Sequence, residues 1–193
     1  MNIKNVLTNL DFELLDVVSY DKDVIIFHEG ELCDKVGYVL EGEINIVSYS
    51  SNGDENIISI VKENEFFANA LIFSNSPYYL GEVIVEKGSK ILFINKDKLI
   101  SLLQNNKDFL LYYLNKISKK TVYMSSRNKL LSIKNIRERI LYYLDINKGV
   151  INISITNLSK ELIIPRPSIS REISKMIDEG IILKNKKLIK LRM

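Results

Sequence analysis

The spacing of hydrophobic residues changes several times along this chain of 193 residues. Near the start, apolar residues recur every three or four positions, which predicts a helix over 2–18. These residues are Leu7, Leu10, Leu14 and Val17. The apolar residues then gather into short β-rich runs, at 24–27, 36–40, 44–49, 57–61, 82–85 and 90–94. Turn signals separate these runs, and the first four turns recur every 11 to 12 residues, a rhythm typical of a sandwich or jelly roll.

Two local features are predicted within this β-rich region. Asn52-Gly53 is a strong hairpin signal, because both residue types accept a positive φ angle. The stretch from Glu65 to Ile72 (EFFANALI) interrupts the strands, and we expect it to form one short helical turn.

A long helical pattern over about 107–131 follows a shorter helix over 96–104. One stripe on the long helix repeats in steps of four and three, a spacing typical of a narrow coiled-coil seam. The stripe consists of Leu110, Leu114, Ile117, Thr121, Met124, Asn128 and Leu131. It either forms a dimer interface with a second copy or packs on the chain's own β-rich domain. The dimer interface is favoured, because so narrow a strip suits another helix better than a sheet.

The last third of the chain opens with a helix and a strand. Asn135 is followed three residues later by Glu138, a pair that resembles a capping box and predicts a helix through Ile146. Lys148-Gly149 ends this helix, and 150–155 is predicted as a strand that leads into the next element.

Residues 156–183 predict two short helices joined by a tight turn. The first spans about 156–163 and stops before Pro165, which cannot continue a helix. The second opens near Pro167 or Ser168, where a proline is tolerated, and Gly180 is placed to end it. Two short strands around a basic turn, Lys184-Asn185-Lys186-Lys187, complete the chain.

A helix–turn–helix followed by a basic hairpin is a winged helix, a module that binds DNA. The predicted DNA contacts face outward from the second helix and the hairpin. They are Arg166, Ser168, Ser170, Arg171, Ser174, Lys186 and Lys187. Arginine gives the bidentate geometry that reads guanine, and serine bonds phosphates or base edges. The alternative is an ordinary helical hairpin with a solvated charged face, and the basic hairpin that follows favours DNA binding.

The distribution of charge agrees with a polyanion-binding module at this end of the chain. Residues 134–193 hold 13 Lys and Arg against 6 Asp and Glu, a net charge of +7. Residues 1–133 hold 14 against 18, a net charge of −4. A basic segment beside an acidic remainder is expected when a DNA-binding domain is attached to a separate domain.

Several classes of protein are excluded by the residues that are rare or missing. One cysteine, Cys33, and one histidine, His28, cannot supply a four-cysteine iron–sulfur cluster or a typical structural zinc site. The chain has no Gly-rich phosphate loop and no G-x-S-x-G motif, so we predict no catalytic residue and no enzyme activity. It has no membrane-spanning run and no signal-peptide core, which predicts a cytoplasmic protein without membrane contact.

This order of elements resembles the Crp/Fnr superfamily of bacterial transcription regulators over nearly the whole chain. The most specific similarities are RPSISREISKM-x₃-GII in the helix–turn–helix, and Gly30, Gly42 and FF-x₃-LIF in the roll. The resemblance implies an α+β protein in three parts. These are a cyclic-nucleotide-binding-like sensory β-roll (double-stranded β-helix or jelly roll) over 1–106, a dimerisation helix over 107–133 and a winged helix–turn–helix over 134–193.

The resemblance also implies a homodimer that binds a two-fold symmetric site on double-stranded DNA, with RNA polymerase as a further partner. The family's base-contacting positions carry over to Arg166, Ser170 and Arg171, while Pro167 stands where relatives often carry a polar residue. The family's architecture places a hinge near 133–135. The alternative function is a module that binds a small ligand or a protein rather than DNA.

The roll departs from members of the family that bind cyclic AMP. Their Gly-Glu and Arg-Ser pairs fall here on Ala68-Asn69 and Tyr79-Leu80, so a buried phosphate would lose its charged partner. We therefore do not expect cyclic AMP binding, and the effector is either an unknown small molecule or none. The candidate effector pocket comprises Phe67, Ala68, Asn69, Tyr79, Leu80, Met124 and Ser125, although aromatic residues in a roll are usually core.

No cofactor is predicted for this chain. Some members of the family bind haem in the roll, so haem is kept as an alternative with His28 as its ligand. His28 lies beside a strand end in the turn FHEG, which favours a surface histidine instead. Cys33 is interpreted as a turn or packing residue rather than as a redox switch.

Overall fold

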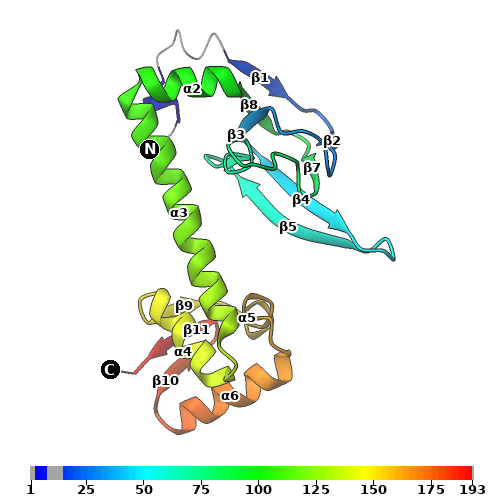
Figure 1. Ribbon diagram of the computed structural model, residues 1–193. Coiled ribbons are helices and arrows are strands. Elements are labelled where there is room, and N and C mark those ends of the chain that lie inside the picture. Colours follow the sequence, from blue (N-terminus) through cyan, green and yellow to red (C-terminus); the bar gives the residue numbers. More distant parts are fainter. Residues whose placement is uncertain (1–2, 8–14, 193) are drawn as a thin grey trace. The chain divides into compact units, whose positions relative to one another are not determined.

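The chain forms two compact units in the computed structural model, which describes residues 3–7 and 15–192 (Figure 1). The first unit extends to Lys119, and the second begins at Lys120. This boundary lies within one continuous helix, α3 (Lys107–Ser132), which therefore contributes to both units.

The first unit contains a roll of two antiparallel sheets, each with four strands (Figure 1). One sheet has the order β1-β8-β3-β6, from β1 (Asp16–Ser19), β8 (Lys90–Asn95), β3 (Lys35–Glu41) and β6 (Phe66–Phe67). The other has the order β2-β7-β4-β5, from β2 (Val24–Phe27), β7 (Glu82–Val85), β4 (Glu43–Tyr49) and β5 (Glu55–Lys62). Pairing of strands far apart in sequence, such as β1 with β8, is expected of the jelly roll that the turn rhythm predicts.

Alternation along β3 separates the interior of the roll from its helix-covered face. Tyr38 lies on the helix-covered face, where its hydroxyl is 2.9 Å from that of Tyr112 in α3. The neighbouring Gly37 faces the interior, and the ring of Phe67 occupies the space in which a Cβ would lie. Both faces of β3 are thereby covered, and residues 36–40 are all buried.

The six β-rich runs predicted from the sequence are all strands, and the Asn52-Gly53 hairpin is confirmed. The turn differs in detail from the expectation, because only Gly53 of the pair has a positive φ (83°). Its N–H donates to the Ser50 carbonyl at 2.9 Å, and the Ser50 N–H donates to the Asp54 carbonyl at 2.9 Å.

The helix predicted over 2–18 is wrong where the structure describes this region. A short 3₁₀ turn, η1 (Ile3–Asn5), is followed later by β1, whose Val17 is paired with Leu92 of β8. Positions 8–14, including Leu10 and Leu14, lie outside the described residues. Hydrogen bonding to the free edge of β8 takes precedence over a helical spacing that depended on those two leucines.

The helical turn predicted for Glu65 to Ile72 is partly correct. The first part is strand instead, because Phe66 and Phe67 pair with β3 as β6. The turn begins at Ala68, which has a φ of 60°, and its carbonyl accepts the N–H of Ile72 at 3.1 Å.

One asparagine ends the next helix and begins the long one. Helix α2 (Lys96–Asn105) ends where the Asn106 N–H donates to the Leu102 carbonyl at 2.9 Å. The Asn106 side-chain oxygen then accepts the Phe109 N–H at 2.9 Å and so caps α3. Its amide group donates to the Val6 carbonyl at 2.9 Å, which attaches this corner to the N-terminal segment.

The second unit is the winged helix–turn–helix that the sequence predicts. Its helices are α4 (Ile136–Ile146), α5 (Ile155–Leu162) and α6 (Arg166–Asp178). Its sheet has the order β10-β11-β9, from β9 (Val150–Asn152), β10 (Ile182–Asn185) and β11 (Leu188–Leu191). Its core consists of Leu130, Ile140, Leu144, Ile151, Leu158, Leu162, Ile164, Ile169, Ile173, Met176, Ile182 and Ile189.

Gly180 ends α6 as predicted. It has a φ of 73°, its N–H donates to the Ile177 carbonyl, and the Ile181 N–H donates back to the Met176 carbonyl, both at 2.9 Å. This pattern is a Schellman motif, which satisfies carbonyls at the helix end and turns the chain into β10.

The turn between α5 and α6 contains a residue in a strained backbone conformation. Ile163 caps the C-terminus of α5 with φ 50° and ψ 51°, although its side chain is exposed. The left-handed conformation costs an L-residue roughly 1–2 kcal/mol, and β-branched residues are least suited to it.

We expect Ile163→Gly to raise the free energy of unfolding. Relief of the left-handed strain exceeds the extra chain entropy of glycine, so the net gain should be about 0.5–1 kcal/mol. Urea unfolding measures this change, with Ile163→Ala as the matched variant that removes the same exposed side chain but keeps a Cβ. A glycine variant no more stable than the alanine variant would show that the position carries no strain.

Candidate nucleic-acid interface

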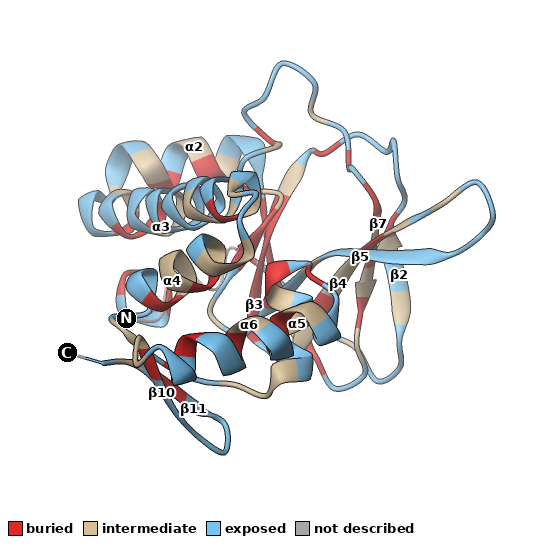
Figure 2. Ribbon diagram, turned by 90° about the horizontal axis from the view of Figure 1, so that it is seen from below, coloured by how far each residue is buried: buried red, intermediate tan, exposed pale blue. Residues whose placement is uncertain are grey.

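Helix α6 buries one side and exposes the other (Figure 2). Ile169, Ile173 and Met176 are buried in the core of the second unit. Of the predicted contact residues on α6, Ser168 is half-buried, and the exposed members are Arg166, Ser170, Arg171 and Ser174. The amphipathic spacing that predicts this helix therefore also places the polar residues on its outer face.

The start of α6 is set by two prolines and the turn before it. Pro165 is the N-cap residue and Pro167 lies in the first turn, so α6 begins at Arg166, slightly earlier than the sequence predicts. The preceding helix α5 has a conventional cap, because the Ser154 hydroxyl accepts the Asn157 N–H at 3.1 Å. After α5, the Ile164 N–H donates to the Ser159 carbonyl at 3.1 Å and closes the turn.

Two exposed polar side chains of α6 donate to backbone carbonyls of their own helix and, within the described part of the chain, make no tertiary hydrogen bond. The Arg171 Nε donates to the Pro167 carbonyl at 3.3 Å, and the Ser174 hydroxyl donates to the Ser170 carbonyl at 3.1 Å. Such local hydrogen bonds are weak. These donors can therefore turn to a nucleic-acid acceptor without breaking a tertiary contact.

The hairpin of β10 and β11 places further basic residues on the same unit. Asn185 pairs with Leu188 and encloses a two-residue turn of Lys186 and Lys187, in which Lys186 has a φ of 52°. Both lysine side chains are exposed. The Lys187 carbonyl accepts the Ile153 N–H at 2.9 Å, which fixes the hairpin against the segment after β9.

Two arginines of α4 organise this unit, and the sequence reasoning missed both. The Arg139 side chain donates to the carbonyls of Ile133 (Nε, 2.7 Å), Leu162 (Nη1, 3.0 Å) and Leu131 (Nη2, 3.2 Å), at the ends of α3 and α5. Arg137 binds two carboxylates of α6. The sequence shows that α4 carries charged residues. It does not show their partners, because residue spacing identifies only neighbours within the same helix.

The candidate dimer stripe on α3 is only partly covered. Leu114 and Met124 are 48% and 45% exposed, and Thr121 and Asn128 are also exposed. The remaining three stripe residues, Leu110, Ile117 and Leu131, are half-buried. A different face of α3 is buried, through Phe109, Tyr112, Tyr113 and Leu130.

The candidate effector residues differ in their exposure and belong to both units. Phe67 and Tyr79 are buried in an aromatic cluster with Phe27 and Phe93, in which the Tyr79 ring stacks on Phe27 at 4.5 Å between centroids. Leu80 is 68% exposed. The other candidates are the half-buried Ala68, the buried Asn69, and the exposed Met124 and Ser125, which belong to the second unit.

His28 and Cys33, the single histidine and the single cysteine of the chain, lie in different environments. The His28 side chain is exposed, with its Nδ1 3.4 Å from Glu82 Oε1. Cys33 is buried, and burial raises the pKa of its thiol, which disfavours the reactive thiolate. Among the described residues, no group of three or more His, Cys, Asp and Glu is arranged to hold a metal ion. The described part of the chain also contains no helix long and apolar enough to cross a membrane.

Comparisons with known proteins match the roll to a domain family and most of the chain to a regulatory protein. Residues 17–106 match the family model described as the cyclic nucleotide-binding domain. The anaerobic regulatory protein of Bacillus subtilis is 26% identical over 187 residues, covering 89% of this chain and 79% of that protein.

Two solved structures extend the similarity to the fold. A transcriptional regulator from Thermotoga maritima is 26% identical, with a TM-score of 0.59 over 68% of this chain and 98% of that chain. A CooA variant from Carboxydothermus hydrogenoformans is 14% identical, with a TM-score of 0.65 over 100% of this chain and 92% of that chain. With the roll, the long helix and the winged helix in this order, the chain is similar to transcription regulators over most of its length, which supports the predicted resemblance to the Crp/Fnr superfamily.

Proposed function

We propose that this protein is a homodimeric transcription regulator that binds a two-fold symmetric DNA site through α6 and the β10–β11 hairpin. The observation that carries the proposal is the presence, on one compact unit, of an exposed polar face of α6 and an exposed lysine turn. The similarity to an anaerobic regulatory protein and to a transcriptional regulator supports it. Function on DNA places the protein in the cytoplasm, with RNA polymerase as a further partner.

In this proposal the residues of the winged unit (134–193) divide into two roles. Arg171 is centrally placed on the exposed face of α6 and reads a base edge, with Arg166, Ser168, Ser170 and Ser174 as its neighbours. Lys186 and Lys187 neutralise phosphates and position the module without reading sequence. Pro167 contributes no side-chain hydrogen bond, so base recognition depends on the arginines and serines around it.

The long helix (107–133) joins two copies of the chain in this proposal. Leu114 and Met124 are exposed at positions of the predicted seam, and the exposed Leu111 and Val122 widen the apolar surface. Isolated exposed apolar residues are ordinary, but a run along one long helix is typical of a surface that another helix covers. A dimer presents two copies of α6 to successive turns of DNA.

The roll (1–106) serves as an effector domain that does not use cyclic AMP. The positions that would bind the ribose and phosphate carry Ala68, Asn69, Tyr79 and Leu80. Tyr79 and Phe67 pack in the aromatic core, and the Asn69 carbonyl already accepts the Tyr113 hydroxyl at 3.1 Å. His28 is exposed, which does not favour haem. The protein has no proposed enzyme activity.

We expect Arg171→Ala to weaken binding to the cognate DNA site by ~1–3 kcal/mol, because a bidentate base contact is lost. Genomic fragments captured by the purified protein define that site, and fluorescence anisotropy measures the affinity. Arg171→Lys is the matched variant, since it keeps the charge but not the planar fork. It should lose discrimination between cognate and scrambled duplexes while its salt dependence stays unchanged. Equal cognate affinity in all three proteins would remove Arg171 from base recognition.

The double variant Lys186→Gln, Lys187→Gln should weaken binding to all DNA sequences alike. Loss of two phosphate contacts should reduce the slope of log affinity against log salt by about 2. The control is Lys119→Gln, Lys120→Gln, which removes the same charge from two exposed lysines of α3. A shallow salt dependence in the unaltered protein would instead support the alternative of a protein-binding module.

Cyclic AMP should not change the midpoint of thermal unfolding, even at millimolar concentration. A ligand that binds only the native state raises stability with its concentration, so binding would appear as a progressive rise in the midpoint. Adenosine 5′-monophosphate is the control for non-specific nucleotide effects. A rise specific to cyclic AMP would overturn the assignment of the roll.

A further inference from the structure

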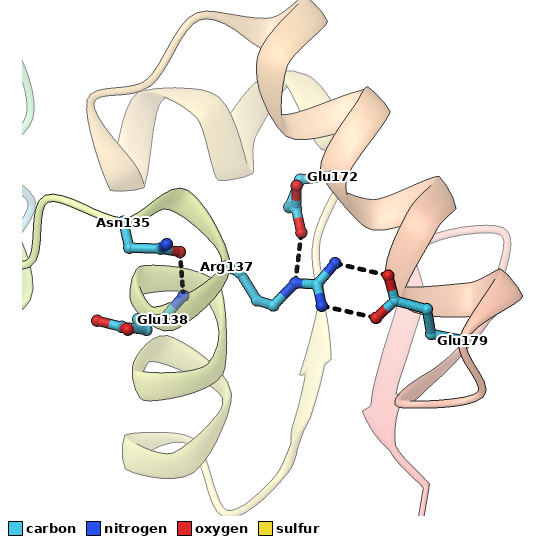
Figure 3. Close-up of polar contacts among 5 residues, drawn as sticks. All are labelled: Asn135, Arg137, Glu138, Glu172 and Glu179. Carbon is cyan, nitrogen blue, oxygen red and sulfur yellow. Dashed lines mark hydrogen bonds and ion pairs between the residues drawn. The ribbon is translucent and has the colours of Figure 1, made fainter.

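A single arginine of α4 binds Glu172 of α6 and Glu179, the C-cap residue of α6 (Figure 3). The Arg137 Nε donates to Glu172 Oε1 at 2.6 Å. Its Nη1 and Nη2 donate to the two carboxylate oxygens of Glu179 at 2.6 and 2.9 Å. All three guanidinium nitrogens are therefore used, and the bidentate pairing with Glu179 fixes the plane of the group.

The two glutamates contact Arg137 at two points along α6. They are seven residues apart, which is almost two helical turns, so they share one face of α6 about 10 Å apart along the axis. Rotation of α6 about its axis moves both carboxylates away from the Arg137 guanidinium, so these charged hydrogen bonds oppose it. Arg171 adjoins Glu172 in sequence, so the same contacts set the direction in which Arg171 leaves the helix.

The positions of these charges are unfavourable for the individual helices. Arg137 lies in the first turn of α4, where acidic residues are preferred, and Glu179 is the C-cap residue of α6, where basic residues are preferred. The charge of each residue therefore interacts unfavourably with the dipole of its own helix. The contact between the helices accounts for both.

The contact with Glu172 is better shielded from solvent than the contact with Glu179. Glu172 is only 18% exposed and Arg137 33%, against 47% for Glu179. Partial burial reduces the screening that makes fully exposed ion pairs weak. The same arrangement neutralises carboxylates on the helix that approaches DNA, where an unpaired negative charge repels phosphates.

We propose that Arg137 is a positioning residue that holds α6 in the orientation needed to discriminate between DNA sequences. The inference deepens the proposed function and rests on it. Asn135 caps α4 by accepting the Glu138 N–H at 3.2 Å, so α4 begins directly after the short link that follows α3 (Figure 3). Arg137 lies two residues after Asn135. Through its contacts with Glu172 and Glu179, a movement of the start of α4 is transmitted to α6.

The decisive variant is the double substitution Glu172→Gln, Glu179→Gln in the full chain. Charge alone predicts tighter binding to every duplex, because two negative charges leave the DNA-facing unit. Loss of positioning instead changes discrimination between sequences. The ratio of the affinity for the cognate duplex to the affinity for a scrambled duplex should fall about tenfold. The matched control, Glu138→Gln with Asp145→Asn, removes two charges from exposed positions of α4 and should leave the ratio unchanged.

Amide hydrogen exchange along α6 tests the contact without DNA. The double glutamine variant should exchange faster in α6, and the control variant should not. An unchanged affinity ratio with unchanged exchange would overturn the inference. A different result would overturn the proposed function instead: the unaltered protein does not discriminate between duplexes, yet α6 exchanges faster in the double glutamine variant. The contact of Arg137 with Glu172 and Glu179 would then stabilise α6 without any role in DNA recognition. Arg137→Lys, which cannot pair with both carboxylates in the same way, should give an intermediate ratio.

Discussion

The second unit depends on the satisfaction of helix-end carbonyls by one guanidinium. Arg139 donates to carbonyls of Leu131, Ile133 and Leu162, at the ends of α3 and α5, where the backbone has no helical partner of its own. Positive charge is also favourable at a helix C-terminus. Arg137 is two residues away and so on a different side of α4, from which it reaches α6. The contacts of α4 with α3, α5 and α6 thus include two charged side chains, which makes α4 the element that sets the geometry of the proposed DNA-binding surface.

Helix α3 is the second constraint, because it belongs to both units. Its first half packs through Phe109, Tyr112 and Tyr113 on the roll, where Tyr112 is 2.9 Å from the hydroxyl of Tyr38. Its second half belongs to the winged unit, in which Leu130 is buried and Arg127 donates to Glu161 Oε2 of α5 at 3.1 Å. The continuous backbone of α3, together with the Arg127–Glu161 contact, therefore connects the roll to α5. Coupling along that route requires two stable arrangements of α3, each favoured by different contacts.

Prediction from the sequence succeeded where the signal was local and failed where the partner was distant. The spacing of Ile169, Ile173 and Met176, with Gly180 after them, defined α6 and its exposed face. The strand at Val17 was missed because it depends on pairing with Leu92, far along the chain. Arg137 was missed for the same reason, since Glu172 and Glu179 are 35 and 42 residues away. The left-handed Ile163 was also missed, because no residue-type preference points to a β-branched residue in that conformation.

The aromatic interior of the roll limits how an effector can act there. Phe27, Phe67, Tyr79 and Phe93 are buried together, and Gly37 leaves room only for the Phe67 ring. A ligand that enters this core must displace at least one aromatic side chain, whose burial contributes roughly 1.5–3 kcal/mol. That cost alone would weaken its apparent affinity by about 10- to 150-fold relative to a preformed pocket. The buried Tyr79 hydroxyl makes no hydrogen bond of normal geometry to the residues that the structure describes, so a ligand that supplied an acceptor there would recover part of the cost. The four aromatic residues themselves offer no charged partner for a phosphate, which agrees with the absence of a Gly-Glu and Arg-Ser pair at positions 68–69 and 79–80.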